Sequence, residues 1–166
     1  MGYYNRLPQL ENTLKMISYS EYNNIEIIIV NDKSDEGHNP QNIVNKYQSI
    51  FKNNIKLINI NQKEYVNPCI AYNTGIYHST GDILIVQNSE VMYIDDIIKY
   101  TVENLKENDY FSYTCVGSDS FLTNQTIGDL VTSKDDYLKN YTAIKQMLTT
   151  TNISGNTIKN VQRLGY

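Results

Sequence analysis

Several motifs that define large enzyme classes are missing from this chain. Its 166 residues contain no G-x-G-x-x-G motif, which argues against a dinucleotide-binding site, and no G-x-x-x-x-G-K-[ST] motif, which excludes P-loop chemistry. The absence of a G-x-S-x-G motif also disfavours an α/β-hydrolase. Any catalytic or binding site must therefore be built from residues outside these motifs.

Cysteine, long apolar runs and positive charge are also scarce. The two cysteines, Cys69 and Cys115, are too few for a disulfide scaffold and favour a reducing compartment. No run approaches the ~18 apolar residues of a membrane span, and the first residues lack the pattern of a signal peptide. A net charge of −4 disfavours a dedicated nucleic-acid-binding protein. We therefore expect a soluble, cytoplasmic protein with no transmembrane segment and no nucleic acid as partner.

Short apolar runs alternate with amphipathic segments along most of the chain. The apolar runs predict strands over 25–30, 55–60, 83–86 and 109–116. Helical spacing of apolar residues predicts helices over 8–20, 40–51, 67–79, 94–107 and 134–148. The first and third strands are almost continuously apolar, which indicates burial on both faces, as in a parallel sheet. The alternation predicts an α/β fold with a mostly parallel sheet flanked by helices on both faces.

The chain length predicts one domain, since about 100–200 residues are typical of a domain. The strand–helix alternation occupies residues 1–117, and residues 118–166 form a short, partly helical C-terminal region of the same domain. Within that region, residues 149–160 are rich in Thr, Asn, Ser and Gly and predict a loose segment. Residues 158–166 have no predicted element.

Polar side chains follow the predicted strands, at the edge where open α/β sheets bind ligands. Asp32 follows the first strand, and its carboxylate could accept N–H donors of a base or ribose, or close a turn or cap a helix. Asn88 and Glu90 follow the third strand. Their oxygens suit Mg²⁺ or Mn²⁺ held jointly with phosphates, and the same residues also suit an ordinary turn.

Two blocks of the sequence resemble family 2 glycosyltransferases with the Rossmann-like GT-A fold. Tyr4-Asn5-Arg6, Thr13-Leu14 and the run ending in Asn31-Asp32-Lys33-Ser34 are similar to the family's opening. Residues 67–86 are similar to the helix and strand that precede its Asp-x-Asp motif, and Gln87-Asn88-Ser89-Glu90 resembles a Gln-Asn-Pro-Glu variant of that motif. The blocks lie in order and cover about residues 3–107.

The resemblance implies a transferase that binds a nucleotide-diphosphate sugar, UDP-linked, with Mn²⁺ or Mg²⁺ and passes the sugar to an acceptor hydroxyl. It implies four nucleotide-binding residues: Tyr4, Asp32, Asn73 and Asn88. Tyr4 would pack against the base and Asp32 would hydrogen-bond to it. Glu90 would coordinate the cation that bridges the diphosphate, whose negative charge grows as it leaves.

The chain departs from the family pattern at several positions. The family's first strand lies in the middle of its sheet, whereas here it is missing or truncated before Tyr4. Open sheet edges invite pairing with another chain, so we expect a homo-oligomer. The Asp-x-Asp motif has become Asn88-x-Glu90, with one carboxylate fewer. Three further residues differ from the usual Asp, Gly and Arg, namely Asn31, Lys33 and Tyr72.

No catalytic base motif follows Gly117, and the catalytic residue is left unassigned. The acidic residues considered there are Asp119, Asp129, Asp135 and Asp136, and a solvated acidic face is the favoured explanation of each. These departures support an alternative function, a non-catalytic GT-A-like module for nucleotide-sugar binding or assembly. The main prediction is a glycosyltransferase, and it requires that Asp32 and Glu90 converge on one crevice.

Overall fold

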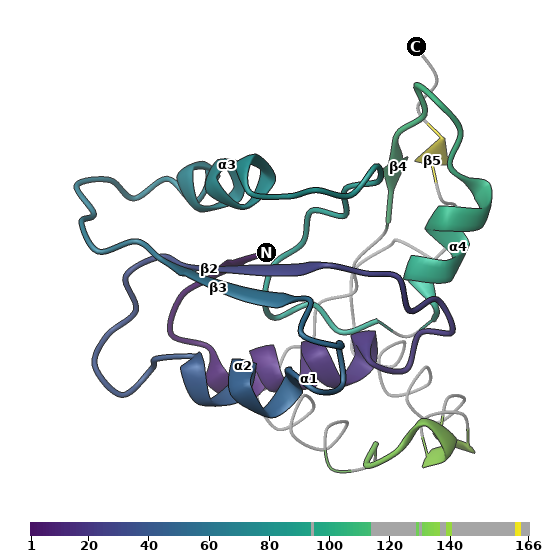
Figure 1. Cartoon of the computed structure of the whole chain (residues 1–166), viewed down its shortest axis with the longest axis horizontal. Helices are drawn as coiled ribbons and strands as arrows, with labels where there is room; N and C mark the ends of the chain where they lie inside the picture. The colour runs from purple at the N-terminus through teal and green to yellow at the C-terminus, as the bar shows by residue number, and fades with distance from the viewer. Residues whose placement is uncertain (94, 114–128, 130, 137–138, 141–161, 164–166) are drawn as a thin grey trace, which may run out of the picture. The chain divides into compact units, whose positions relative to one another are not determined.

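A parallel three-stranded sheet forms the centre of the first part of the molecule (Figure 1). The computed structural model describes residues 1–93, 95–113, 129, 131–136, 139–140 and 162–163. The strands are β1 (Gly2–Tyr3), β2 (Ile27–Asn31) and β3 (Ile55–Asn59), in the order β1-β2-β3. Both pairings are parallel, which confirms the predicted sheet type.

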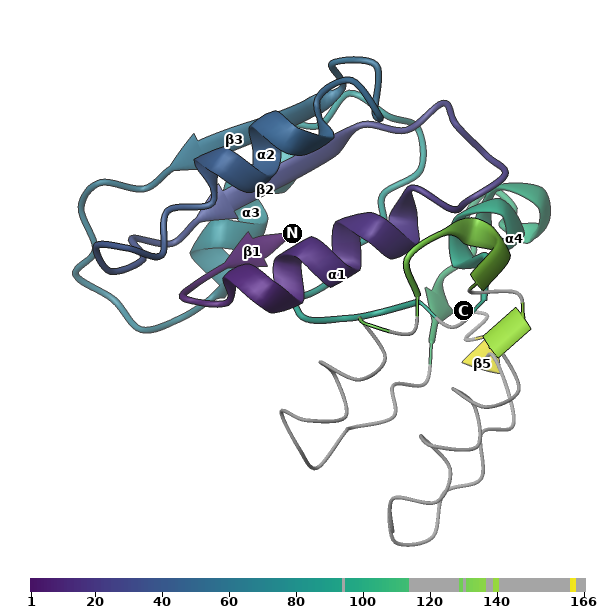
Figure 2. The same ribbon diagram turned by 90° about the horizontal axis from the view of Figure 1, so that it is seen from below.

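Helices cover both faces of this sheet (Figures 1 and 2). Helices α1 (Leu7–Ile17) and α2 (Gln41–Tyr47) lie on one face, and α3 (Cys69–Tyr77) lies on the other. Helix α3 approaches β2 closely at Gly75, where a Cβ atom would lie 3.4 Å from the side chain of Val30. The predicted α/β fold with helices on both faces is therefore confirmed.

The sequence explains why β2 and α1 form where they do. Strand β2 is composed almost entirely of β-branched residues, and all five of its residues are buried between the helix layers. Helix α1 begins next to Pro8, whose missing N–H costs nothing in a first turn. Its apolar side chains at Leu10, Leu14 and Ile17 are buried because helical spacing places them on one face.

Helix α2 is shorter than the predicted helix over 40–51. It ends at Tyr47, and the chain then turns through Lys52 and Asn53, whose φ angles are 51° and 65°. A left-handed conformation at two successive residues cannot continue an α-helix. The turn brings the chain directly into β3.

Strand β1 is present and is two residues long. Its two residues pair with the end of β2, and the Val30 N–H donates to the Met1 carbonyl at 2.9 Å. The Met1 ammonium donates to the Ile28 carbonyl at 2.6 Å, so the hydrogen-bond ladder reaches the first residue. Burial lowers the pKa of this ammonium to about 6. The homo-oligomer expected from open sheet edges stays a prediction.

The predicted buried strand over 83–86 is wrong. The segment is irregular, and Leu84 and Val86 are 49% and 58% exposed. A parallel bridge to Gly2 forms only at Asn88, two residues after the segment. Residues 83–86 form no strand because β1 has only two residues, Gly2 and Tyr3, and neither of them lies opposite this segment.

Residues Ile94–Tyr166 form a second compact unit. Helix α4 (Ile97–Asn104) begins at Asp96, whose carboxylate accepts the Lys99 N–H at 3.1 Å. Strand β4 (Phe111–Ser112) pairs antiparallel with β5 (Gln162–Arg163), a strand that the sequence did not predict.

Several predictions for the second unit fall largely outside the described residues. Residues 134–136 and 139–140 are helical, and the rest of the predicted helix over 134–148 is not described. The same holds for the end of the strand predicted over 109–116, for Asp119 and for the segment 149–160. The predicted division of the domain at residue 117 stays a prediction. Among the helices that the structure describes, none is long and apolar enough to cross a membrane.

Candidate functional site

Strands β1 and β2 end side by side, and Tyr4 and Asp32 follow them directly. Because the two strands are parallel, their carboxyl ends share one edge of the sheet. Beyond this edge both segments turn through a left-handed residue, Asn5 with φ 51° and Lys33 with φ 55°. The edge is therefore lined by the residues at and just after the strand ends.

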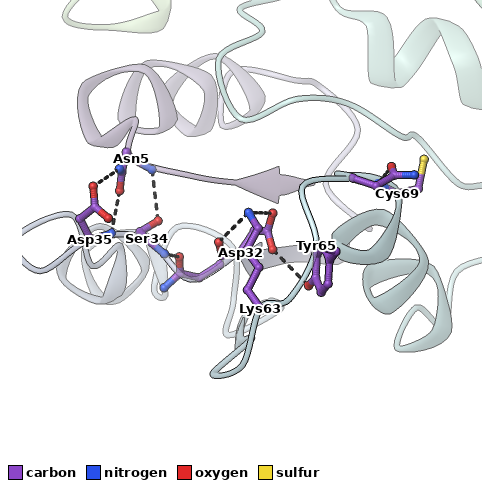
Figure 3. Close-up of polar contacts among 9 residues, drawn as sticks. Asn5, Asp32, Ser34, Asp35, Lys63, Tyr65 and Cys69 are labelled. Carbon is purple, nitrogen blue, oxygen red and sulfur yellow. Dashed lines mark hydrogen bonds and ion pairs between the residues drawn. The ribbon is translucent and has the colours of Figure 1, made fainter.

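The Asp32 carboxylate is buried and has a partner on each oxygen (Figure 3). The Lys63 ammonium lies 2.6 Å from Oδ2, and the Tyr65 hydroxyl donates to Oδ1 at 3.2 Å. The same ammonium lies 4.8 Å from the centroid of the Tyr4 ring, which is itself 48% exposed. Asp32, Lys63 and Tyr4 thus form a continuous group of acceptor, cation and aromatic face.

Asn5 holds the loop after β1 to the loop after β2 (Figure 3). Its backbone N–H donates to Ser34 Oγ at 3.1 Å, and its Oδ1 accepts the Asp35 N–H at 2.8 Å. Its Nδ2 also donates to Asp35 Oδ2 at 2.5 Å. In the sequence, Asn5 belongs to a family-like motif but has no evident role, and the structure shows that it fixes the shape of this edge.

The loop that carries Asn88 and Glu90 lies on the other side of β1. The bridge between Gly2 and Asn88 places the start of this loop beside the strand. The buried Thr13 of α1 holds the next part, with its Oγ1 2.8 Å from the Ser89 carbonyl oxygen. The position of Glu90 is therefore set by both β1 and α1.

Glu90 lies near the residue that follows Tyr4 and Asn5. The Arg6 Nε is 4.0 Å from Glu90 Oε1, and the Glu90 side chain is 37% exposed. The segment Tyr4-Asn5-Arg6 consequently runs from the group around Asp32 to the carboxylate of Glu90. The two acidic residues thus share one edge of the sheet, on opposite sides of β1.

Tyr72 connects α3 to the Asn88 loop. Its hydroxyl donates to Asn88 Oδ1. Burial, and after it the negative charge of Glu90, raises the pKa of Tyr72, so the hydroxyl remains a donor at neutral pH. The sequence showed Tyr72 only as a departure from the usual Arg, and its partners became visible only in three dimensions.

Asn73 and Gln87 are polar neighbours of Tyr72 and Asn88 in the chain. Asn73 follows Tyr72 on α3 and is exposed, and its predicted contact with nucleotide stays a prediction. The Gln87 amide oxygen accepts from the Tyr93 hydroxyl, whereas its buried amide nitrogen has no acceptor among the described residues. Gln87 therefore places an unused donor beside the Asn88 loop.

The residues of this edge fit a cation that arrives with a phosphate ligand. Among the residues that the structure describes, no group of three or more His, Cys, Asp or Glu side chains could hold a metal ion. Glu90 alone supplies a carboxylate to the segment 87–90. Mg²⁺ is commonly held by one or two carboxylates together with substrate phosphates, and this donor set meets that requirement.

A comparison with protein families agrees with this geometry. The model of glycosyl transferase family 2 matches residues 1–160, which include every residue of the edge described above. No curated protein and no solved structure matches the chain significantly. A match over nearly the whole length, together with the parallel sheet and its helix layers, leads to one conclusion. The chain belongs to glycosyl transferase family 2.

Proposed function

We propose that the chain binds a UDP-linked sugar with Mn²⁺ or Mg²⁺ and transfers the sugar to an acceptor hydroxyl. One observation carries the proposal: Asp32 and Glu90 lie at the same edge of the sheet, joined by the segment Tyr4-Asn5-Arg6. Membership of a glycosyltransferase family supports the reaction class. Experiments can test three parts of the proposal: the identity of the nucleobase, the requirement for a divalent cation, and the ability of the chain to catalyse transfer.

Asp32, Lys63 and Tyr4 are suited to a uracil ring. Uracil presents an N–H between two carbonyl groups, so it needs an acceptor beside a donor. The Asp32 carboxylate is such an acceptor, and the Lys63 ammonium 2.6 Å away is such a donor. A carboxylate has about four acceptor positions, so Asp32 can accept a further N–H while it keeps Lys63. The exposed face of Tyr4 offers a stacking surface for the base.

Glu90 and Arg6 are suited to the diphosphate. Glu90 would hold the divalent cation jointly with the phosphate oxygens, and Arg6 adds a positive charge 4.0 Å from that carboxylate. The cation, when bound, neutralises the charge that develops on the leaving diphosphate. Asn88 and Asn73 would contact the nucleotide from the loop and from α3.

A thermal-shift and calorimetric screen of UDP, GDP, ADP and CDP tests the proposal, with each nucleotide measured with and without Mn²⁺. We expect UDP to bind best and Mn²⁺ to strengthen its binding. At 100 times its dissociation constant, a ligand adds about 2.7 kcal/mol to the free energy of unfolding. A preference for GDP would overturn the uracil assignment, and equal UDP binding with and without Mn²⁺ would overturn the cation.

Two isosteric substitutions locate the binding within the edge. Asp32→Asn should abolish most UDP binding, and Glu90→Gln should remove mainly the Mn²⁺-dependent part. Asp82→Asn and Glu36→Gln are matched controls, because both side chains are exposed and lie outside the proposed site. Equal losses in the controls would show that the effects are not specific to the edge.

Release of UDP from UDP-sugars separates an enzyme from a binding module. We expect release that depends on both Asp32 and Glu90, either by transfer to an added acceptor or by slow hydrolysis of the donor. UDP-sugar binding without any release would instead establish the non-catalytic module that the altered Asn88-x-Glu90 motif also allowed.

A further inference from the structure

We infer that Tyr72 and Asn88 form a hydrogen-bond relay that sets the orientation of Glu90, which makes Tyr72 a positioning residue for the cation and diphosphate. The inference rests on the function proposed above and deepens it. It concerns a residue on α3, which lies outside the loop that carries Asn88 and Glu90.

The relay follows from the two ends of the Asn88 amide. The Tyr72 hydroxyl donates to Asn88 Oδ1, so the amide oxygen faces α3. In a primary amide the NH₂ group then points the other way, and here Nδ2 lies 3.5 Å from Glu90 Oε1. Without Tyr72 the amide would be free to reverse its oxygen and nitrogen. Tyr72 therefore decides that Asn88 presents a donor to Glu90.

A second contact restrains the other carboxylate oxygen. Ser89 is buried, and its Oγ lies 3.4 Å from Glu90 Oε2. Each oxygen of Glu90 thus has a neighbouring donor on the loop. The Asn88 oxygen is already engaged by Tyr72, so the geometry assigns one hydrogen of its NH₂ group to orienting Glu90 and leaves Glu90 as the cation ligand. The second hydrogen of the NH₂ group remains for the proposed contact with the nucleotide.

The Tyr72 ring is held against the sheet and not only by its hydroxyl. A Cβ atom on Gly2 would lie 3.4 Å from the ring carbon Cε1 of Tyr72, so the ring packs directly on β1. Gly2 is also the residue that bridges to Asn88. Because the ring is fixed by packing, removal of the hydroxyl alone should leave the ring in place and break only the relay.

The Tyr72 hydroxyl is neutral, so the relay supplies orientation and not charge. Its loss should therefore reduce the contribution of the cation to nucleotide binding and leave cation-free binding unchanged. Substitution of a residue that orients a metal ligand typically lowers metal affinity about 10–100-fold. The two donors lie 3.5 Å and 3.4 Å from the Glu90 oxygens, and these are long hydrogen bonds. We therefore expect the loss of affinity to be about tenfold.

The test compares Tyr72→Phe with Tyr77→Phe. Tyr77 is on the same helix and 85% exposed, so its substitution is a matched control. UDP affinity is measured with and without Mn²⁺, and the side-chain amide resonances of Asn88 are recorded without metal. We expect Tyr72→Phe to shift those resonances and to lower the Mn²⁺-dependent gain about tenfold, while Tyr77→Phe does neither.

Asn88→Ala keeps the inference testable if Tyr72→Phe is poorly folded, because this variant alone should lower the Mn²⁺-dependent gain about tenfold. In Asn88→Ala the relay is broken from the other end, so adding Tyr72→Phe to it should cause no further loss of the Mn²⁺-dependent gain. Additive losses, or a full gain in Tyr72→Phe, would overturn the relay and leave the proposed function standing. Absence of any gain in the unmodified chain would refute the proposed function itself, and the relay with it.

Discussion

Lys63 links Asp32 to Tyr4 at the edge of the sheet. Its ammonium lies 2.6 Å from the Asp32 carboxylate and 4.8 Å from the centroid of the Tyr4 ring. Both groups attract a cation, the first through its charge and the second through the negative face of its π-system. The proposed site for the nucleobase therefore contains an acceptor, Asp32, and a donor, Lys63, whose charges compensate each other before any ligand binds.

Substitution of Lys63 should destabilise the protein. In Lys63→Met the Asp32 carboxylate would lose its cation while remaining buried, because the side chains are only 20% and 8% exposed. We expect the free energy of unfolding to fall by about 3–5 kcal/mol, as measured by urea denaturation.

The ion pair between Lys46 and Glu11 provides the control. Its distance is 2.5 Å, similar to that of the buried pair, but the Lys46 and Glu11 side chains are 62% and 36% exposed. Lys46→Met should therefore change the free energy of unfolding by less than about 1 kcal/mol. Equal losses in the two lysine variants would show that burial of Asp32 has no energetic effect.

Thr13 should affect both stability and cation-dependent binding. In Thr13→Val the buried Ser89 carbonyl loses the hydroxyl 2.8 Å away, which should cost about 1–3 kcal/mol. The freed loop should also weaken UDP binding in the presence of Mn²⁺. Thr13→Ser keeps the hydroxyl and should preserve the binding, so a serine variant as weak as the valine variant would contradict this role.

The irregular segment 83–86 should tolerate polar side chains. Leu84→Ser and Val86→Ser should each change the free energy of unfolding by no more than about 0.5 kcal/mol, because both residues are well exposed. Ile29→Ala, in the fully buried β2, should cost about 2–5 kcal/mol. Losses of similar size at Leu84 and Ile29 would indicate a buried strand after all.

In a polypeptide that begins with a free amine at Met1, this amine should make stability depend on pH between about 6 and 8. Burial lowers its pKa from 8.0 to about 6 in the folded protein, so in this range the unfolded chain binds more protons. The free energy of unfolding should therefore rise with pH through this interval, by at most about 2–3 kcal/mol. Acetylation of the amine should abolish this rise in chemical denaturation experiments, and an unchanged slope would contradict the assignment.

The sequence predicted β2 correctly and the segment 83–86 incorrectly for the same physical reason. Both are short apolar runs rich in β-branched residues. Strand β2 has a partner on each side, whereas residues 83–86 would need a longer β1 to complete their hydrogen bonds. Local propensity predicts where a strand can form, but pairing with distant residues decides whether it does.

In the candidate site, too, local sequence patterns identify some residues, whereas contacts between residues far apart in the chain identify the others. Asp32 and Glu90 could be selected from the sequence because they follow apolar runs at the ligand-binding edge. Lys63 ends the polar segment that follows the second predicted strand, but its pairing with Asp32 could not be predicted, and neither could the role of Tyr65. Both residues lie in an irregular loop without periodicity and reach Asp32 only through the path of the folded chain. The role of Tyr72 likewise depends on the proximity of Gly2 and Asn88, which no local pattern records.

The hydrogen bond from the Met1 ammonium to Ile28 has a practical consequence for recombinant work. A purification tag fused directly before Met1 replaces a buried amine with a peptide bond and continues as additional backbone beside β2. Such a fusion alters the sheet next to Gly2 and Asn88, not merely the solvent-facing end of the polypeptide. Tagged and untagged preparations should therefore be treated as distinct molecules when their ligand affinities are compared.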